Sequence, residues 1–161
     1  MRTHLTARPT TASIGVVALA GAALLLGAGA GAADDTQGGR PLDASLSGAN
    51  EVSATGVLGV GDPDGSGTAR VTVNPGQNLV CWEITVEGIN GATRGHIHEA
   101  VAGANGPIVV EFFEAGNTML EGCTTPTGTT AREILKDPAG FYVNIHNADF
   151  PAGAIRGQLS P

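Results

Sequence analysis

The sequence of 161 residues is poor in cysteine, aromatic side chains and catalytic motifs, and each shortage excludes something. It contains only two cysteines and no CxxC spacing, which argues against a thiolate metal site. Aromatic residues make up 4%, so we expect a largely aliphatic core with Trp82 as its largest member. No GxSxG, P-loop or HExxH motif is present. We therefore expect no enzymatic activity.

Long apolar runs are also missing, except near the start of the chain. Arg2 and Arg8 give a positive start, residues 14–26 are apolar, and an Ala-Gly-Ala ends at residue 32. This pattern is typical of a signal peptide, which we assign to residues 1–32. The alternative is a retained anchor, but the run is short of the ~20 strongly apolar residues that a span needs. We expect a secreted, extracellular protein with no membrane span after cleavage.

Basic residues are few, with 8 Lys and Arg against 15 Asp and Glu, so the formal net charge is −7. Removal of the leader takes away two arginines and makes this balance more negative. An acidic domain is not attracted to nucleic acid or to anionic membrane surfaces. The sequence therefore leaves an unknown extracellular protein or polymer as the expected partner.

The two cysteines, Cys81 and Cys123, both lie in the exported part of the chain, where disulfides persist. We expect them to form one disulfide bond. The chain-entropy model gives such a bridge ~4 kcal/mol, which is an upper figure because strain in the native state subtracts from it.

After the leader, a polar and glycine-rich stretch predicts a flexible stalk over residues 33–43, followed by one domain over residues 44–161. Short strand-like segments then alternate with turn signals such as DPDGSG at residues 62–67, where a calcium loop lacks its twelfth ligand. Residues 131–136 predict one helical turn. The pattern favours an all-β fold, an antiparallel β-sandwich of immunoglobulin-like or Cu/Zn superoxide dismutase-like type, with a small closed barrel as the alternative. The segments expected to be strands are residues 42–48, 68–73, 79–87, 93–100, 108–113, 141–146 and 154–160.

Every histidine after the leader lies in two of these segments, TRGHIHEA and FYVNIH. Because alternate residues of a strand share a face, His96 and His98 lie together on one strand, and His146 lies on the polar face of another. Imidazoles at this spacing can bind one copper or zinc ion jointly, with His146 as a third ligand. No other cofactor is expected.

The alternative for the same residues is a polar network without metal, and we favour it. In this interpretation the three histidines form hydrogen bonds with each other and with Arg94, Asn144 and Arg156, and so fix the register of the strands. Asn144 also stands, with Glu99 and Tyr142, among the residues that could orient the rings around a metal.

Five short motifs stand out after the leader: LSGANEV at residues 46–52, GHIH at 95–98, NGP at 105–107, YVNIH at 142–146 and GAIRGQL at 153–159. Together they resemble the CHRD domain, a module found in chordin and in many secreted bacterial proteins. Ser53 and Glu99 depart from the usual family pattern, which often has Pro and Gly there. The resemblance implies a secreted β domain with no established catalytic activity. GHIHE also resembles the copper-ligand strand of Cu/Zn superoxide dismutases, but the histidines are too few for that enzyme.

These observations predict a secreted, non-enzymatic extracellular binding or structural module. Two alternatives remain open at this stage. One is a metal-binding protein that uses His96, His98 and His146, and the other is an enzyme with an unrecognised site.

Overall fold

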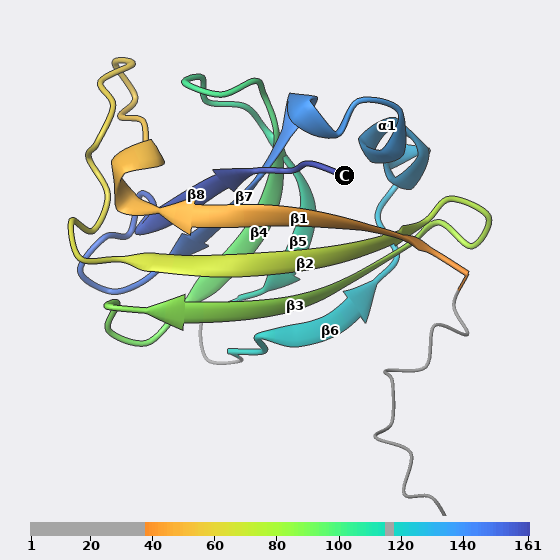
Figure 1. Cartoon of the computed structure of the whole chain (residues 1–161), viewed down its shortest axis with the longest axis horizontal. Helices are drawn as coiled ribbons and strands as arrows, with labels where there is room; N and C mark the ends of the chain where they lie inside the picture. The colour runs from red at the N-terminus through yellow and green to blue at the C-terminus, as the bar shows by residue number, and fades with distance from the viewer. Residues whose placement is uncertain (1–37, 115–117) are drawn as a thin grey trace, which may run out of the picture. The chain divides into compact units, whose positions relative to one another are not determined.

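The computed structural model describes residues 38–114 and 118–161, and within them eight strands form one antiparallel sheet (Figure 1). The order of strands across the sheet is β5-β4-β7-β8-β1-β2-β3-β6. The all-β antiparallel fold expected from the sequence is confirmed. The strands are β1 (Arg40–Ser47), β2 (Ser66–Asn74), β3 (Leu79–Glu87), β4 (Arg94–Glu99), β5 (Ile108–Phe113), β6 (Glu121–Thr124), β7 (Phe141–His146) and β8 (Ile155–Gln158).

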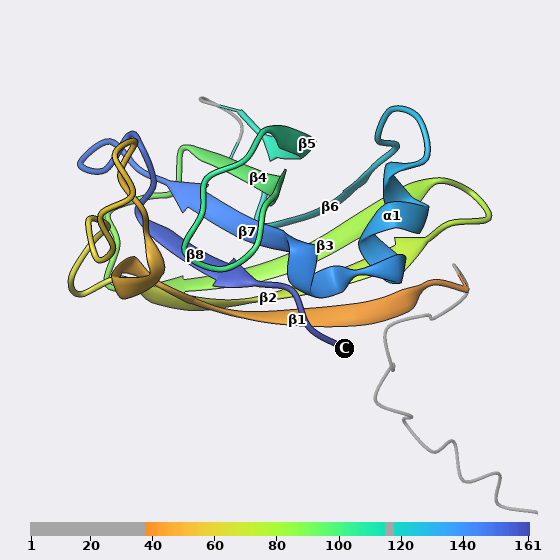
Figure 2. The same ribbon diagram turned by 90° about the horizontal axis from the view of Figure 1, so that it is seen from above.

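The sheet folds over on itself at a narrow seam between β1 and β8. These two strands share one register pair, Ser47 with Arg156, and an isolated bridge joins Asp43 to Ser160. The halves on either side of the seam face each other as two layers (Figure 2). We call β1, β2, β3 and β6 the front half and β4, β5, β7 and β8 the back half. The two layers of the expected sandwich are therefore parts of one continuous sheet.

The apolar faces of both halves meet in a largely aliphatic core. Ile97 and Val143 from the back half are completely buried, as is Val80 from the front half. Trp82 of β3 stacks on Phe112 of β5 with ring centroids 4.7 Å apart, and its indole nitrogen donates to the carbonyl of Met119. Burial of these faces drives the halves together.

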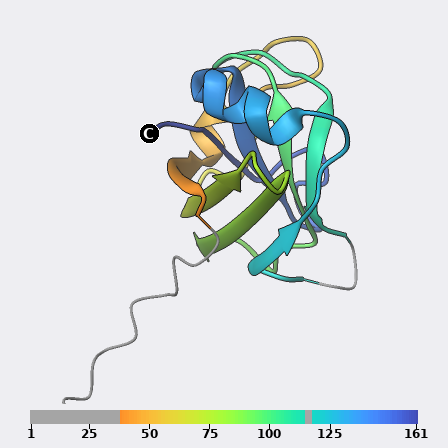
Figure 3. The same ribbon diagram turned by 90° about the vertical axis from the view of Figure 1, so that its right-hand side faces the viewer.

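Helix α1 (Thr130–Lys136) covers one end of the two layers, with Ala131 and Ile134 fully buried (Figure 3). It agrees with the helical turn expected at residues 131–136. Two short 3-10 helices, η1 (Gly48–Asn50) and η2 (Pro138–Gly140), lead into loops. Among residues 38–114 and 118–161, no helix has the length and apolar character needed to cross a membrane.

The expected stalk is wrong at its C-terminal end, because residues 40–43 belong to β1. Arg40 pairs with Val73, and Leu42 is buried. The reason is that the apolar alternation of Leu42, Ala44 and Leu46 extends the core-facing side of the strand toward the N-terminus. The rest of the stalk up to residue 37, and the expected signal peptide over residues 1–32, lie outside the described residues.

The disulfide between Cys81 and Cys123 is confirmed. The two cysteines stand opposite each other on β3 and β6. Strand β6, of four residues, was not expected from the sequence, because it is short and polar. The bridge attaches this edge strand covalently to the front half.

Candidate functional site

Strand β7 is buried on both of its faces, which is unusual for a strand in an antiparallel sandwich. Its core-facing residues alternate with Tyr142, Asn144 and His146, which are at most 7% exposed. Loops cover this second face: residues 51–60, 100–107 and 147–153, which we call the roof loops. The polar face of the back half is therefore an enclosed layer rather than a solvated surface.

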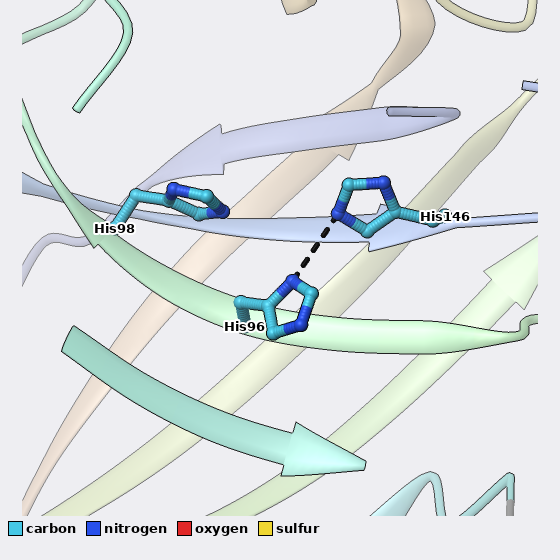
Figure 4. Close-up of side chains that lie close together, drawn as sticks. All are labelled: His96, His98 and His146. Carbon is cyan, nitrogen blue, oxygen red and sulfur yellow. Dashed lines mark hydrogen bonds between the residues drawn. The ribbon is translucent and has the colours of Figure 1, made fainter. Parts of the chain in front are cut away.

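The pairing of β4 with β7 brings together His96, His98 and His146, the three histidines that follow the leader. Arg94 stands opposite His146 and His98 opposite Tyr142 in the register. The Nδ1 of His96 lies 3.2 Å from the Nε2 of His146, and His98 approaches both rings from the side (Figure 4). One nitrogen from each ring lies within 4.8 Å of the other two. We call these three residues the histidine cluster.

The outer nitrogens of two rings are held by backbone carbonyls of the roof loops. The Nδ1 of His98 lies 2.9 Å from the oxygen of Gly106, and the Nδ1 of His146 lies 3.1 Å from the oxygen of Pro151. A carbonyl only accepts, so both Nδ1 atoms carry the proton and both Nε2 atoms carry a lone pair. The Nδ1 of His96 must then donate to the Nε2 of His146.

Burial keeps the cluster neutral. Burial and, to a smaller extent, the nearby His98 lower the pKa of His96 to about 4, while Glu114 opposes the change. Burial likewise lowers the pKa of His146 to about 4, with His96 as the next cause. The pKa of His98 is also lowered, again mainly by burial. All three rings are therefore neutral near pH 7, each with a single ring proton.

Next to the histidines, Arg156 organises a second group of buried polar residues. Its Nη1 donates to the carbonyl of Ala104 at 3.0 Å, and its Nη2 donates to Oδ1 of Asn105 at 2.6 Å. Its guanidinium lies 4.0 Å from the ring centre of Tyr142, which also stacks on His98. We call Glu51, Asn105, Tyr142, Asn144 and Arg156 the arginine cluster.

Glu51 is the buried partner of this arginine. Its Oε2 lies 3.2 Å from the Nε of Arg156 and accepts from Nδ2 of Asn144 at 3.3 Å. Burial raises the pKa of Glu51, and the charge of Arg156 opposes that shift. Gly153 has a φ of +147°, and a Cβ there would lie 2.6 Å from the Oε1 of Glu51. Only glycine leaves room for this carboxylate.

The network expected from the sequence is therefore divided in the structure. Asn144 and Arg156 belong together, joined through Glu51, whereas Arg94 donates to the carbonyl of Pro151 beside His146. The sequence reasoning missed Glu51 and Asn105 as members. A signal was present, because a buried arginine requires a buried acceptor and both residues lie in the motifs at 46–52 and 105–107.

A pocket of about 520 Å³ opens beside the arginine cluster, between the roof loops and the sheet. Its floor includes His98, Tyr142 and Asn144. Its walls are mostly apolar, formed by Val52, Ala54, Val60, Phe150, Pro151 and Ala152. The site thus combines an enclosed polar floor with an apolar rim.

Comparisons with known proteins identify the family of the chain but no individual relative. No curated protein and no solved structure matches the chain. The model of the CHRD domain family matches residues 42–159, which include every strand and both clusters except the first two residues of β1. The chain therefore belongs to the CHRD domain family.

Proposed function

We propose that this protein is an exported, non-catalytic binding module that holds a polar group of an extracellular protein or polymer under the roof loops. The pocket carries the proposal. Its volume of about 520 Å³ lies within the range of sites that hold small organic groups, and apolar walls with a few polar atoms are typical of such sites.

The polar atoms of the pocket floor that remain free for a ligand are hydrogen-bond acceptors. Arg156 directs its terminal nitrogens at protein oxygens, and Nδ2 of Asn144 faces Glu51. The Oδ1 of Asn144 is buried and has no hydrogen-bond partner among the described residues. The carboxylate of Asp149 stands at the exposed rim. A group that brings hydroxyl or amine donors therefore complements this pocket best.

Two observations support a role without catalysis in the extracellular space. Both cysteines are in a disulfide, which is typical of an oxidising compartment. Within the described residues, the ring nitrogens of the histidines contact carbonyls, another histidine or a carboxylate, and none contacts a hydroxyl or thiol. The pairing of nucleophile and base that covalent catalysis needs is thus missing from this part of the chain.

Titration with glucose and with butylamine, followed by amide NMR spectra, tests the proposal. We expect one of these two probes, at millimolar concentration, to shift the amides of Val52, Gly106 and Gly153. Ala54→Trp fills the mouth of the pocket from an exposed position and should abolish these shifts. Ala139→Trp adds the same side chain at an exposed site on η2 and should leave them unchanged. Shifts that persist in Ala54→Trp, or no shift with either probe, would contradict the proposal.

A further inference from the structure

The three rings of the histidine cluster converge on one point from two paired strands. A tetrahedral ion with nitrogen ligands at ~2.0–2.1 Å holds neighbouring ligand atoms about 3.3 Å apart. The Nδ1 of His96 and the Nε2 of His146 already lie 3.2 Å apart, and one ring nitrogen from each of the three histidines lies within 4.8 Å of the others. A small movement of His98 therefore completes three corners of a tetrahedron.

The hydrogen bonds of the outer nitrogens select which atoms face this point. Gly106 and Pro151 hold the Nδ1 protons of His98 and His146, so both rings turn an Nε2 lone pair inward. The Nε2 of His98 is buried and has no hydrogen-bond partner among the described residues. Such support of the outer nitrogen by a carbonyl is the usual arrangement around a metal-bound histidine.

From this geometry we propose that His96, His98 and His146 bind one divalent copper or zinc ion, through Nδ1 of His96 and Nε2 of the other two. Three neutral imidazoles suit these borderline metals, and the fourth position is left for water or an external ligand. Copper binds more tightly than zinc in the general order of divalent metals. The metal site is distinct from the binding pocket, because it shares only His98 with the pocket floor and its other two ligands do not line the pocket.

Metal binding requires a change of tautomer in His96. Its Nδ1 proton, donated to His146 in the metal-free protein, must move to Nε2 so that Nδ1 can bind the ion. The proton is conserved in this exchange, and its new position faces the carboxylate of Glu114, whose Oε1 lies 3.9 Å from that nitrogen. Glu114 is then the carboxylate that orients the third ligand.

The test uses the purified protein, stripped with a chelator and titrated with Cu²⁺ or Zn²⁺. We expect one ion per chain and a rise in Tm that grows with free metal concentration. Copper EPR should show nitrogen ligands, and long-range ¹⁵N spectra with Zn²⁺ should show His96 changing from the Nδ1–H to the Nε2–H tautomer.

Asparagine variants keep the proposal falsifiable, because Asn places a donor near the position of Nδ1 but lacks the Nε2 atom. His98→Asn and His146→Asn should therefore fold, with their bonds to Gly106 and Pro151 retained, yet lose the metal-dependent rise in Tm. Glu114→Gln should weaken metal binding by about 10- to 100-fold. Glu87→Gln makes the same charge change at an exposed site on β3 and should leave the affinity unchanged.

Two results would overturn the metal site. One is a native protein whose Tm and spectra do not respond to either metal, which leaves the cluster as a hydrogen-bonded layer alone. The other is an equal response in both asparagine variants, which would place the metal elsewhere on the acidic surface.

Discussion

The outer face of the front half is exposed to solvent, whereas the outer face of the back half is buried. On the front half, Thr68 and Thr85 share a hydrogen bond in solvent, and Arg70 lies 3.8 Å from Asp43 with both side chains more than half exposed. On the back half, the corresponding face carries Arg156, which pairs with Glu51 of the roof loops, and both side chains are almost fully buried. An arginine–carboxylate pair thus occurs on each half, exposed to solvent on the front half and buried on the back half.

This difference separates residues that tolerate change from residues that do not. An exposed ion pair adds little to the free energy of unfolding, because solvent screens the charges and the paired side chains lose conformational entropy. A buried pair depends on both partners, since removal of one leaves an uncompensated charge. The front half therefore serves mainly as a scaffold, and the back half concentrates the groups that are sensitive to substitution.

The largest effect is expected from Arg156→Ala. The loss of the guanidinium leaves Glu51 buried without its counter-ion and releases Ala104 and Asn105 from the sheet, which should cost about 3–5 kcal/mol of unfolding free energy. Chemical denaturation of the purified variant measures it. Arg70→Ala, the matched change on the front half, should cost less than about 1 kcal/mol. Equal losses in the two variants would remove the contrast between the halves.

Within the front half, the disulfide should be the most costly feature to remove. The double variant Cys81→Ser, Cys123→Ser frees the short strand β6 and should lower stability by about 2–5 kcal/mol. Thermal melting of native and variant proteins tests this, with thiol labelling of the denatured, unreduced native protein as a control. An unchanged melting curve would show that β6 is held without the bridge.

A smaller loss is expected from His146→Ala in metal-free protein. This change leaves the Nδ1–H of His96 without its acceptor and leaves the carbonyl of Pro151 with only the hydrogen bond from Arg94, and it should cost about 1–3 kcal/mol. His146→Asn should recover part of the loss, because it can still donate to Pro151. Denaturation in the presence of a chelator distinguishes the two variants, and equal stability of both with the native protein would contradict the hydrogen-bonded arrangement.

His96 and His146 should also make the free energy of unfolding depend on pH, with a smaller effect than the substitutions above. The pKa values of His96 and His146 are about 4 in the folded protein and near 6.5 when unfolded, so the unfolded chain binds more protons between these values. The two neutral histidines therefore do not lower the free energy of unfolding above pH 6.5, and they lower it progressively as the pH falls toward 4. Glu51, whose pKa is raised in the folded protein, has the opposite effect, since its protonation favours the folded state as the pH falls. Denaturation midpoints between pH 7 and 4 should fall for the native protein and fall less for His146→Asn.

Seven of the eight described strands were predicted, most of them from a clear alternation of apolar and polar residues. Residues 79–87 show it over a full strand, and the structure places β3 at the same bounds. Strand β6 escaped prediction because its four residues have no apolar face, and its position depends on pairing with β3. Local pattern therefore identifies strands that bury one face and misses those that depend on a neighbour.

For the site, the sequence placed the three histidines on matching strand faces but indicated nothing about the roof. Alternation with polar residues ordinarily predicts a solvated face, and Tyr142 and Asn144 are instead buried. Two of the three roof loops that bury them, residues 51–60 and 100–107, are far from β7 in the sequence. Glu51 and Asn105 meet Arg156 only through the folded topology, which a periodic pattern does not encode.

The seam between the first and last strands has a consequence for the order in which the chain matures. The side chain of Asn50 donates to the backbone oxygen of Arg156, 106 residues later, and Glu51 pairs with the same arginine. During synthesis the carboxylate thus emerges long before the cation that stabilises it, and contacts of such sequence separation form slowly. Closure of the roof must wait for the final strand. A chain that ends before residue 156 would contain all three histidines and most of the sheet, yet it would lack the arginine that connects Glu51, Ala104 and Asn105 of the loops to the sheet.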